Sequence, residues 1–205
     1  MSEKILGMTD EEIRACGYAT HLPILNYLLD ELKPECTLEW GMGFYSTPLL
    51  LEKSGELCSV ETGSEEWYQK ISDKYSGNDS LILMKDISVS GTLEILRGFG
   101  PDVVCDLVFN DGDANSRHIA AQAAQNWGAV VVSHDTQEKQ YHYNSILLRE
   151  GWMWMDIMDY SVWTSVMCKD PELILKLSNK FKKTKVYTGT GLFHKDFTHD
   201  HGRQL

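Results

Sequence analysis

The sequence lacks the features of membrane, secreted and disulfide-rich proteins. No apolar run approaches the ~18 residues that a membrane-spanning helix needs, and residues 1–4 contain no apolar signal segment. The five cysteines are scattered and form no C-x-x-C pair, which argues against a zinc ribbon or a disulfide framework. We therefore expect a cytoplasmic protein without membrane partners.

Basic residues are also scarce. The chain carries 19 Lys and Arg residues against 30 Asp and Glu residues, which gives a formal net charge of −11. Binding to nucleic acid without regard to sequence needs a cationic surface, so we expect no nucleic-acid partner. With 205 residues, 42% of them hydrophobic, the chain has the size and composition of one globular domain. Formation of a homodimer is a further possibility that the sequence leaves open.

Short apolar runs alternate with helix-like segments through most of the chain. The runs occupy residues 37–40, 57–60, 81–84, 106–109 and 129–133, and the helix-like segments occupy residues 47–53, 65–75, 89–96 and 115–127. This alternation favours a parallel sheet that is covered by helices on both faces. Residues 152–158 and 162–168 are joined by a link too short for a parallel crossover, so they predict an antiparallel hairpin. The sequence thus predicts an α/β, Rossmann-like, doubly wound fold with a seven-stranded, mostly parallel sheet and a C-terminal antiparallel hairpin.

Helical segments are expected at both ends of a single domain over residues 1–205. Residues 1–34 predict a helical extension, in which Thr9 and Glu12 have the spacing of a capping box. Residues 37–168 form the expected core, with a connecting helix at about 143–149. Residues 169–205 predict a basic amphipathic helix over 171–183 and a tail.

An acidic residue stands at the end of every expected parallel strand. In chain order these residues are Glu39, Glu61, Asp86, Asp111 with Asp113, and Asp135. Because the carboxyl ends of parallel strands meet at one edge of a sheet, these groups would repel one another unless a ligand offsets their charge. The ligand should therefore present cations, hydroxyls and amino groups rather than phosphates.

The loop of residues 41–48 supports the same expectation. It contains no Lys or Arg that could meet a pyrophosphate. Gly41 and Gly43 allow the backbone to turn and to approach a ligand closely, and Ser46 is a candidate cap for the following helix. The N–H groups at the start of that helix suit the carboxylate of a ligand.

The residues over 37–168 resemble the motifs of the class I S-adenosylmethionine-dependent methyltransferases. Glu39, Gly41 and Gly43 resemble the acidic residue and the G-x-G of the first motif. By this resemblance Glu61 holds the ribose hydroxyls and Asp86 reads the adenine amino group.

Further along the chain, Asp111 and Asp113 lie in a segment that resembles the fourth-strand motif of small-molecule O-methyltransferases. The resemblance implies S-adenosylmethionine as cofactor, with Ser46, Asp111 and Asp113 among the residues that bind it. It also implies methyl transfer to a small-molecule acceptor, and oxygen is the expected accepting atom.

His134 is the first candidate for a general base, because imidazole titrates near neutral pH and can take a proton from a hydroxyl. Asp111 belongs with it in the expected catalytic pair, and His118 is a weaker candidate. We expect the acceptor pocket to include His118, Tyr141 and Tyr143.

A divalent cation is a second candidate cofactor. In the catechol-type relatives, an aspartate after the fourth strand and an Asp-Asn pair after the fifth bind the metal. Asp111 and Asp135 match two of these positions, while Thr136 stands in place of the asparagine. Arg117 is expected to lie exposed on a helix.

Two other functions stay open. Glu61 follows Gly43 by 18 residues, a spacing that also suits the ribose carboxylate of an NAD-dependent oxidoreductase, although the chain has no Tyr-x-x-x-Lys pair. The same fold could also belong to a non-catalytic nucleoside-binding or scaffold protein.

Overall fold

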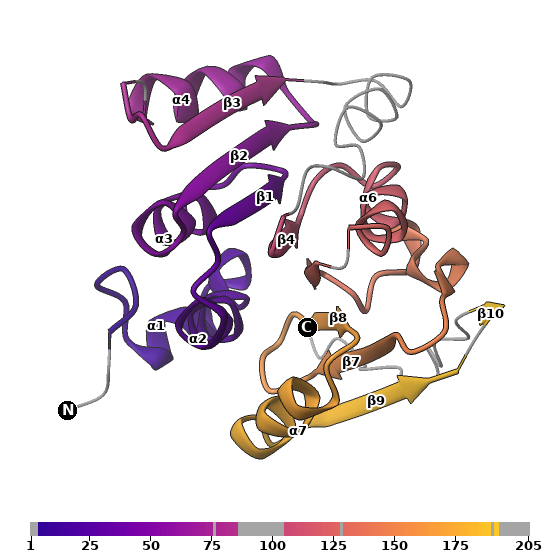
Figure 1. Cartoon of the computed structure of the whole chain (residues 1–205). Helices are drawn as coiled ribbons and strands as arrows, with labels where there is room; N and C mark the ends of the chain where they lie inside the picture. The colour runs from indigo at the N-terminus through magenta and orange to yellow at the C-terminus, as the bar shows by residue number, and fades with distance from the viewer. Residues whose placement is uncertain (1–3, 76, 86–104, 128, 190, 193–205) are drawn as a thin grey trace.

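The computed structural model describes residues 4–75, 77–85, 105–127, 129–189 and 191–192. They form an eight-stranded sheet in the order β3-β2-β1-β4-β5-β8-β7-β9 and a two-stranded sheet of β10 and β6 (Figure 1). The strands are β1 (Cys36–Trp40), β2 (Glu56–Glu61), β3 (Leu81–Lys85), β4 (Leu107–Asn110), β5 (Val130–His134), β6 (Leu147–Leu148), β7 (Met153–Ile157), β8 (Thr164–Cys168), β9 (Thr184–Thr188) and β10 (Gly191–Leu192). The helices are α1 (Asp10–Ala15), α2 (Leu22–Leu32), α3 (Ser46–Lys53), α4 (Glu65–Tyr75), α6 (Arg117–Ala124) and α7 (Pro171–Lys180), with short 3₁₀ helices η1 (Gly17–Ala19), η2 (Lys139–Tyr141) and η3 (Tyr143–Ser145).

The predicted mostly parallel sheet with a C-terminal hairpin is confirmed, but its strand number is wrong. Strands β3, β2, β1, β4 and β5 are parallel, and β7 and β8 form the antiparallel hairpin that was expected. The eighth strand, β9, pairs with β7 in antiparallel register. An edge strand such as β9 needs no fully buried face, so its partly exposed sequence lacks the apolar alternation by which a strand is recognised.

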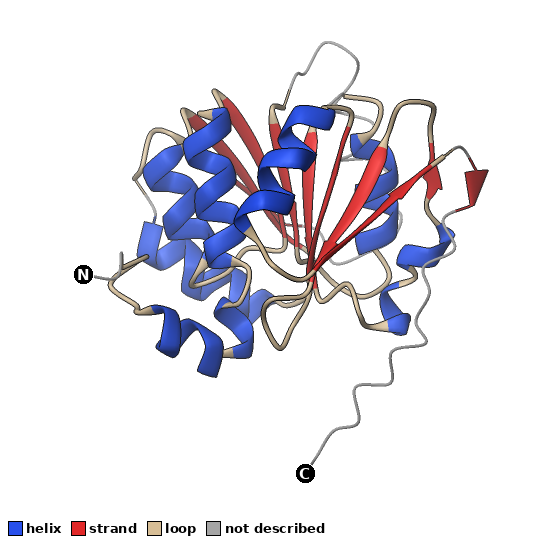
Figure 2. Cartoon of the chain, turned by 90° about the horizontal axis from the view of Figure 1, so that it is seen from below, coloured by secondary structure: helices blue, strands red, loops and turns tan. Residues whose placement is uncertain are grey.

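Both faces of the sheet are covered, as the alternation of strands and helices predicts (Figure 2). Successive side chains of a strand point to opposite faces. In β4, Leu107 and Phe109 join the apolar cluster that includes side chains of α2, α3 and α7, while Val108 joins the cluster that includes side chains of α6. Because both faces of the central strands are buried, their sequences form continuous apolar runs.

The N-terminal extension begins with the expected capping box. The backbone N–H of Thr9 donates to the Glu12 carboxylate over 2.7 Å, and the Glu12 N–H donates to the Thr9 hydroxyl over 3.3 Å. Helix α2 follows, with Pro23 in its first turn and a buried stripe of leucines that joins the apolar core. No helix among the described residues has the length and apolar character needed to cross a membrane.

Two helix predictions are corrected by the structure. The helix expected at about 143–149 is replaced by η3 and β6. His142 has a left-handed backbone (φ +54°), and glutamine side chains in and just after α6 bond the backbone at Leu147 and Arg149. Helix α7 ends three residues earlier than expected, where Phe181 turns into an extended conformation and is buried. The helix expected over 89–96 and the site residue Asp86 lie outside the described residues.

The strand order places a switch point between β1 and β4. From β1 the chain builds β2 and β3 on one side and then returns to place β4 and β5 on the other. In open α/β sheets, ligands bind beyond the carboxyl ends of the strands at such a point. A ligand site is therefore expected at the loops after β1, β2, β4 and β5.

Candidate functional site

A cavity of about 860 Å³ lies at the carboxyl ends of these strands. Its walls come from the loops after β1, β2, β4 and β5, from the link between β7 and β8, and from the N-terminal extension. The lining residues are Gly17, Tyr18, His21, Gly41, Met42, Gly43, Phe44, Tyr45, Ser46, Glu61, Thr62, Gly63, Ser64, Trp67, Asp111, Gly112, Asp113, Arg117, His134, Asp135, Tyr141 and Val162. The predicted carboxylates at the ends of β2, β4 and β5 thus share one cavity.

Gly41 shapes the floor of the cavity. Its backbone is left-handed (φ +91°), and a Cβ atom added there would lie 2.4–2.5 Å from the backbone of Asp111 and Gly112. Glycine is required on both counts, since a side chain would strain the turn and separate the loops after β1 and β4. Close approach of these two loops forms the floor of the cavity.

Glu39 lies beneath the glycine loop and does not line the cavity, so the structure does not place it in contact with a ligand. It is fully buried in β1, where its Oε2 accepts hydrogen bonds from Thr47 (2.8 Å) and Ser59. Burial raises the pKa of Glu39 to about 7, and hydroxyls, including that of Ser46, limit the rise. The Thr47 hydroxyl also accepts from the Gly43 N–H over 3.0 Å, so Glu39 acts on the glycine loop through Thr47.

Glu61 is in the cavity wall, at the end of β2. Its Oε1 accepts from the N–H groups of Gly63 (2.6 Å) and Ser64 (3.0 Å), which fixes the carboxylate at the edge of the loop. Burial raises the pKa of Glu61, while the two backbone hydrogen bonds oppose the rise. A carboxylate held in this way is suited to accept hydrogen bonds from ligand hydroxyls.

Two contacts join the loops on either side of Glu61. The Thr62 hydroxyl accepts from the backbone N–H of Asp113 over 2.8 Å, which connects the loop after β2 to the loop after β4. The Trp67 indole N–H donates to the Met42 carbonyl over 2.6 Å, and the Trp67 ring meets Phe44 edge-on. The result is an aromatic pair beside the acidic wall.

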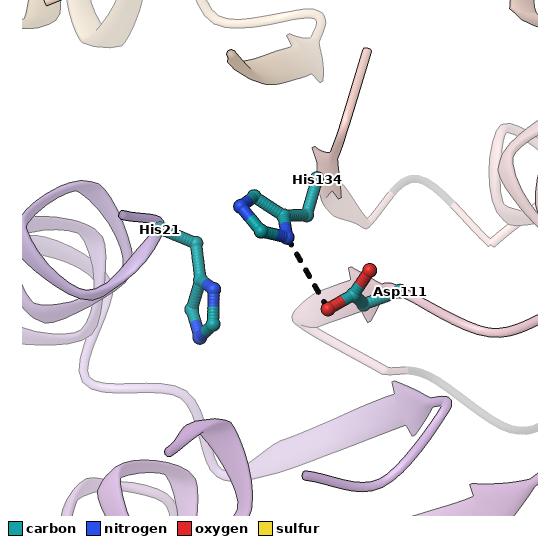
Figure 3. Close-up of side chains that lie close together, drawn as sticks. All are labelled: His21, Asp111 and His134. Carbon is teal, nitrogen blue, oxygen red and sulfur yellow. Dashed lines mark hydrogen bonds and ion pairs between the residues drawn. The ribbon is translucent and has the colours of Figure 1, made fainter. Parts of the chain in front are cut away.

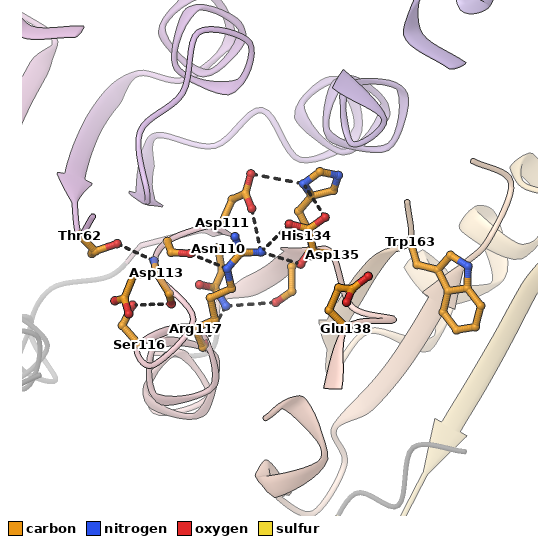
Figure 4. Close-up of polar contacts among 12 residues, drawn as sticks. Thr62, Asn110, Asp111, Asp113, Ser116, Arg117, His134, Asp135, Glu138 and Trp163 are labelled. Carbon is orange, nitrogen blue, oxygen red and sulfur yellow. Dashed lines mark hydrogen bonds and ion pairs between the residues drawn. The ribbon is translucent and has the colours of Figure 1, made fainter. Parts of the chain in front are cut away.

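Arg117 is buried at the start of α6, contrary to the expectation of an exposed residue (Figure 4). Its Nη1 lies 2.9 Å from Asp111 Oδ1 and 3.0 Å from Asp135 Oδ2, so one guanidinium bridges the two carboxylates. Its Nε donates to the Gly112 carbonyl, and the guanidinium carbon lies 3.9 Å from the centre of the Tyr141 ring. A guanidinium thus already supplies positive charge to the two predicted metal ligands, and a metal between Asp111 and Asp135 stays a prediction.

On its other side Asp111 faces two histidines (Figure 3). Asp111 Oδ2 lies 3.3 Å from His134 Nδ1, and the ring centroids of His134 and His21 are 4.7 Å apart. Burial would favour the neutral form of Asp111, but the positive charges of His134 and Arg117 outweigh it and lower its pKa to about 2. Burial and the neighbouring His134 lower the pKa of His21 to about 3, so this imidazole is neutral.

His134 itself is buried at the end of β5. Burial alone would lower the pKa of His134, but the carboxylates of Asp111 and Asp135 raise it overall. Sequence reasoning identified His134 and Asp111 but missed His21. His21 lies in the helical extension, whose position depends on packing that no local sequence signal reveals.

The three predicted acceptor residues have different positions. Tyr141 lines the cavity. Tyr143 is fully buried and donates its hydroxyl to the His134 carbonyl over 3.2 Å, so it supports the wall from behind and does not reach an acceptor. His118 lies outside this cavity, in a smaller hollow with Gln122 and Arg149, and the structure does not bring it to the other site residues.

No protein-family model and no curated protein matches this sequence. Solved structures do match it. An O-methyltransferase from Bacillus cereus in complex with SAH matches with a TM-score of 0.54 at 16% identity, over 78% of this chain and 90% of that one. The O-methyltransferase TomG from Streptomyces achromogenes, involved in tomaymycin synthesis and in complex with SAM, matches with a TM-score of 0.50 at 17% identity, over 79% and 92% of the two chains. The chain has the methyltransferase fold.

The same methyltransferase fold is shared by an rRNA methylase from Streptococcus thermophilus, with a TM-score of 0.50 at 14% identity, over 71% of this chain and 94% of that one. The neighbours therefore include proteins named for different acceptors. For this methyltransferase fold, the acceptor has to be argued from the cavity.

Proposed function

We propose that the chain transfers a methyl group from S-adenosylmethionine to a small molecule, with oxygen as the accepting atom. One observation carries this proposal. The glycine loop after β1, Glu61 at the end of β2 and the Gly112–Asp113 turn after β4 converge on one cavity at the switch point of the sheet. This is the place where open α/β sheets bind their ligands.

The residues present fit this cofactor. The cavity volume falls within the ~300–1,000 Å³ of typical small-molecule sites. Gly41 allows the loops after β1 and β4 to approach each other more closely than a Cβ atom would permit, and the loop to Ser46 contains no basic side chain that would favour a phosphate. Glu61 would hold the ribose hydroxyls, and the N–H groups at the start of α3 would face the cofactor carboxylate.

When bound, S-adenosylmethionine supplies a methyl group made reactive by the sulfonium. The contribution of the chain is to bind, align and exclude water, and alignment alone can supply ~7–11 kcal/mol of barrier reduction. Asp111, Asp113 and Glu61 give the cavity a negative wall that favours a cationic methyl donor over an anionic cofactor.

Asp111 and His134 form the polar end of the cavity and are the catalytic pair of this proposal. Both ring nitrogens of His134 already have partners, since Nε2 lies 2.9 Å from the Thr20 hydroxyl and Nδ1 faces Asp111. His134 is therefore not a free base. We assign the pair to orienting and polarising the acceptor hydroxyl, with Tyr141 beside it in the cavity wall.

Charge favours a small acceptor over nucleic acid. The chain carries a formal net charge of −11, and the cavity is lined by Glu61, Asp111, Asp113 and Asp135 against one arginine. A polyanion would have to approach this wall against repulsion. A neutral or cationic small molecule with a hydroxyl group meets no such barrier.

Calorimetric titration with S-adenosylhomocysteine tests the cofactor assignment. We expect binding to the wild type and at least tenfold weaker binding to Glu61→Gln, because a charge-assisted hydrogen bond is worth ~1.5–3 kcal/mol. Glu66→Gln is the matched control, since Glu66 lies exposed on α4 and pairs with Lys70. Equal affinity of the wild type and Glu61→Gln, or binding of NAD in place of S-adenosylhomocysteine, would contradict the proposal.

Turnover separates an enzyme from a non-catalytic nucleoside-binding protein of the same fold. S-adenosylmethionine is incubated with the protein and a panel of small hydroxylated compounds, and release of S-adenosylhomocysteine is measured. Methylation of a hydroxyl compound supports the proposal. Tight cofactor binding without turnover on the panel, or turnover on RNA alone, would overturn the assignment of a small-molecule acceptor.

A further inference from the structure

His21 is a buried histidine whose ring nitrogens have no hydrogen-bond partner. The residue is 2% exposed, and neither Nδ1 nor Nε2 finds a donor or acceptor in the structure. Leaving a buried polar group without a partner is costly, and each such group calls for an explanation. The ring of His21 lies in the cavity wall, edge-on to the ring of His134.

The hydrogen bonds around His134 leave one of its ring nitrogens, Nδ1, without a hydrogen-bond donor in the neutral form. The Thr20 hydroxyl donates its proton to the Gly17 carbonyl over 3.1 Å, so the oxygen of Thr20 accepts from Nε2–H of His134. In the neutral imidazole this leaves Nδ1 as a lone pair, aimed at the carboxylate of Asp111 3.3 Å away. A positive charge between Nδ1 and Oδ2 removes the repulsion of these lone pairs, and either a proton on Nδ1 or a metal ion can supply it.

We propose that His21, Asp111 and His134 bind a divalent transition-metal ion of the zinc type at the end of this cavity. The three ligand atoms lie within 4.8 Å of one another. Ligands that stand ~2.0–2.2 Å from a zinc ion are roughly 3–3.6 Å apart, so Nδ1 of His134 and Oδ2 of Asp111 already have a suitable spacing and His21 has to move closer. Two imidazoles and one carboxylate are a donor set for zinc and iron(II) rather than for magnesium, which prefers oxygen ligands.

The surrounding residues complete such a site. Thr20 would be the partner of the second nitrogen of His134, and outer hydrogen bonds of this kind fix the tautomer of a metal-binding histidine. Arg117 holds Oδ1 of Asp111 and leaves Oδ2 for the ion. The metal site therefore lies on the opposite side of Asp111 from the position expected between Asp111 and Asp135.

Three protein ligands leave the cavity side of the ion open. An oxygen ligand, either water or a hydroxyl group, would complete the coordination there. Such a ligand would meet the polar end of the cavity where the proposed function places the acceptor. The metal site itself rests on His21, Asp111 and His134 alone, so its test needs no methyl donor.

Metal binding is measured on the full chain after treatment with a chelator, by titration with Zn²⁺ and by the visible spectrum of added Co²⁺. The sequence also contains His199 and His201, which could bind metal on their own. All measurements are therefore repeated in a His199→Ala/His201→Ala background. We expect one ion per chain in both backgrounds, with the spectrum of nitrogen and oxygen ligation.

Two variants test the ligands, and two further variants serve as comparisons. His21→Phe keeps a ring against Phe109 and should weaken metal binding at least 100-fold, as should Asp111→Asn. Thr20→Val keeps all three ligands but removes the hydrogen bonds of the Thr20 hydroxyl to His134 and to the Gly17 carbonyl, and it should weaken metal binding by about 10–100-fold. His118→Ala removes a histidine away from the cluster and should leave the affinity unchanged.

Thermal unfolding without metal confirms that each variant is folded. If the chain with the His199→Ala/His201→Ala background binds no metal, the proposal fails. It also fails if His21→Phe, folded by this criterion, binds Zn²⁺ as tightly as the wild type.

Discussion

The guanidinium of Arg117 holds the carboxylate of Asp111 at 2.9 Å and turns it toward His134. The same guanidinium contacts Asp135 at 3.0 Å. Its positive charge offsets the repulsion between two carboxylates that lie side by side at the ends of β4 and β5. The geometry of the cavity wall therefore depends on one buried cation.

Replacing Arg117 by methionine should destabilise the protein. The variant removes the positive charge and leaves Asp111 and Asp135 close together without compensation. Breaking a buried pair costs ~3–5 kcal/mol, and because both carboxylates are about a quarter exposed we expect roughly 2–3 kcal/mol. The free energy of unfolding in urea measures the change.

Arg14→Met is the matched control for this prediction. Arg14 pairs with Asp10 on the surface, where both side chains are about half exposed, so its loss should cost less than ~1 kcal/mol. An effect of Arg117→Met no larger than that of Arg14→Met would show that the bridge is unimportant for stability.

Glu39 should make the stability depend on pH. Its pKa rises from the ordinary value of 4.5 in the unfolded chain to about 7 in the folded one. The folded state thus favours the protonated form, and this contribution is fully present below about pH 4.5 and is lost as the pH rises through about 7. The shift corresponds to about 3 kcal/mol.

Glu39→Gln should remove this dependence. Unfolding in urea at pH 5 and at pH 8 should show a smaller loss of stability with rising pH in the variant than in the wild type. Glu11→Gln, which alters an exposed residue of α1, should follow the wild-type profile. Parallel profiles for Glu39→Gln and the wild type would contradict the assigned pKa.

Gly41→Ala should disrupt the cavity floor. The new Cβ would meet the backbone of Asp111 and Gly112 at 2.4–2.5 Å, in addition to the strain of a left-handed residue. Gly151→Ala separates the two effects, because Gly151 also has a left-handed backbone (φ +80°) but nothing lies within 4 Å of its Cβ position. Strain alone costs ~1–3 kcal/mol, so Gly41→Ala should lower the melting temperature clearly more than Gly151→Ala.

Thr62→Val should loosen the link between the loops after β2 and β4. The variant leaves the N–H of Asp113 without its acceptor, at a cost of ~1–3 kcal/mol. Thr62→Ser keeps the hydroxyl and should retain most of the stability and of the affinity for S-adenosylhomocysteine. If valine and serine behave alike, the hydroxyl is not what joins the loops.

Much of the fold could be predicted because its signals are local. The capping box of Thr9 and Glu12 needs only neighbouring residues, and the buried strands are marked by short apolar runs. The carboxylates at the ends of β2, β4 and β5 could be gathered into one cavity, since parallel strands place their ends together.

The remaining features depend on contacts between distant segments. From the sequence alone, Arg117 is expected to be an exposed helix residue. In the structure α6 packs so that its guanidinium lies between Asp111 and Asp135. Tyr143 is likewise expected in the acceptor pocket. In the structure it lies in a 3₁₀ helix and is buried behind His134. His21 enters the site only through the packing of α2 on the sheet, which periodicity does not specify.

Strand β9 protects the edge of the large sheet against pairing with other molecules. It covers the free edge of β7, a strand that includes the fully buried Trp154 and Met155, and it offers Lys185 at the new margin. A chain shortened after residue 183 would leave an apolar strand open to pairing with other molecules, and charged margins are a common protection against this. Such a truncated chain should therefore aggregate at concentrations at which the full chain stays dispersed, which light scattering would reveal.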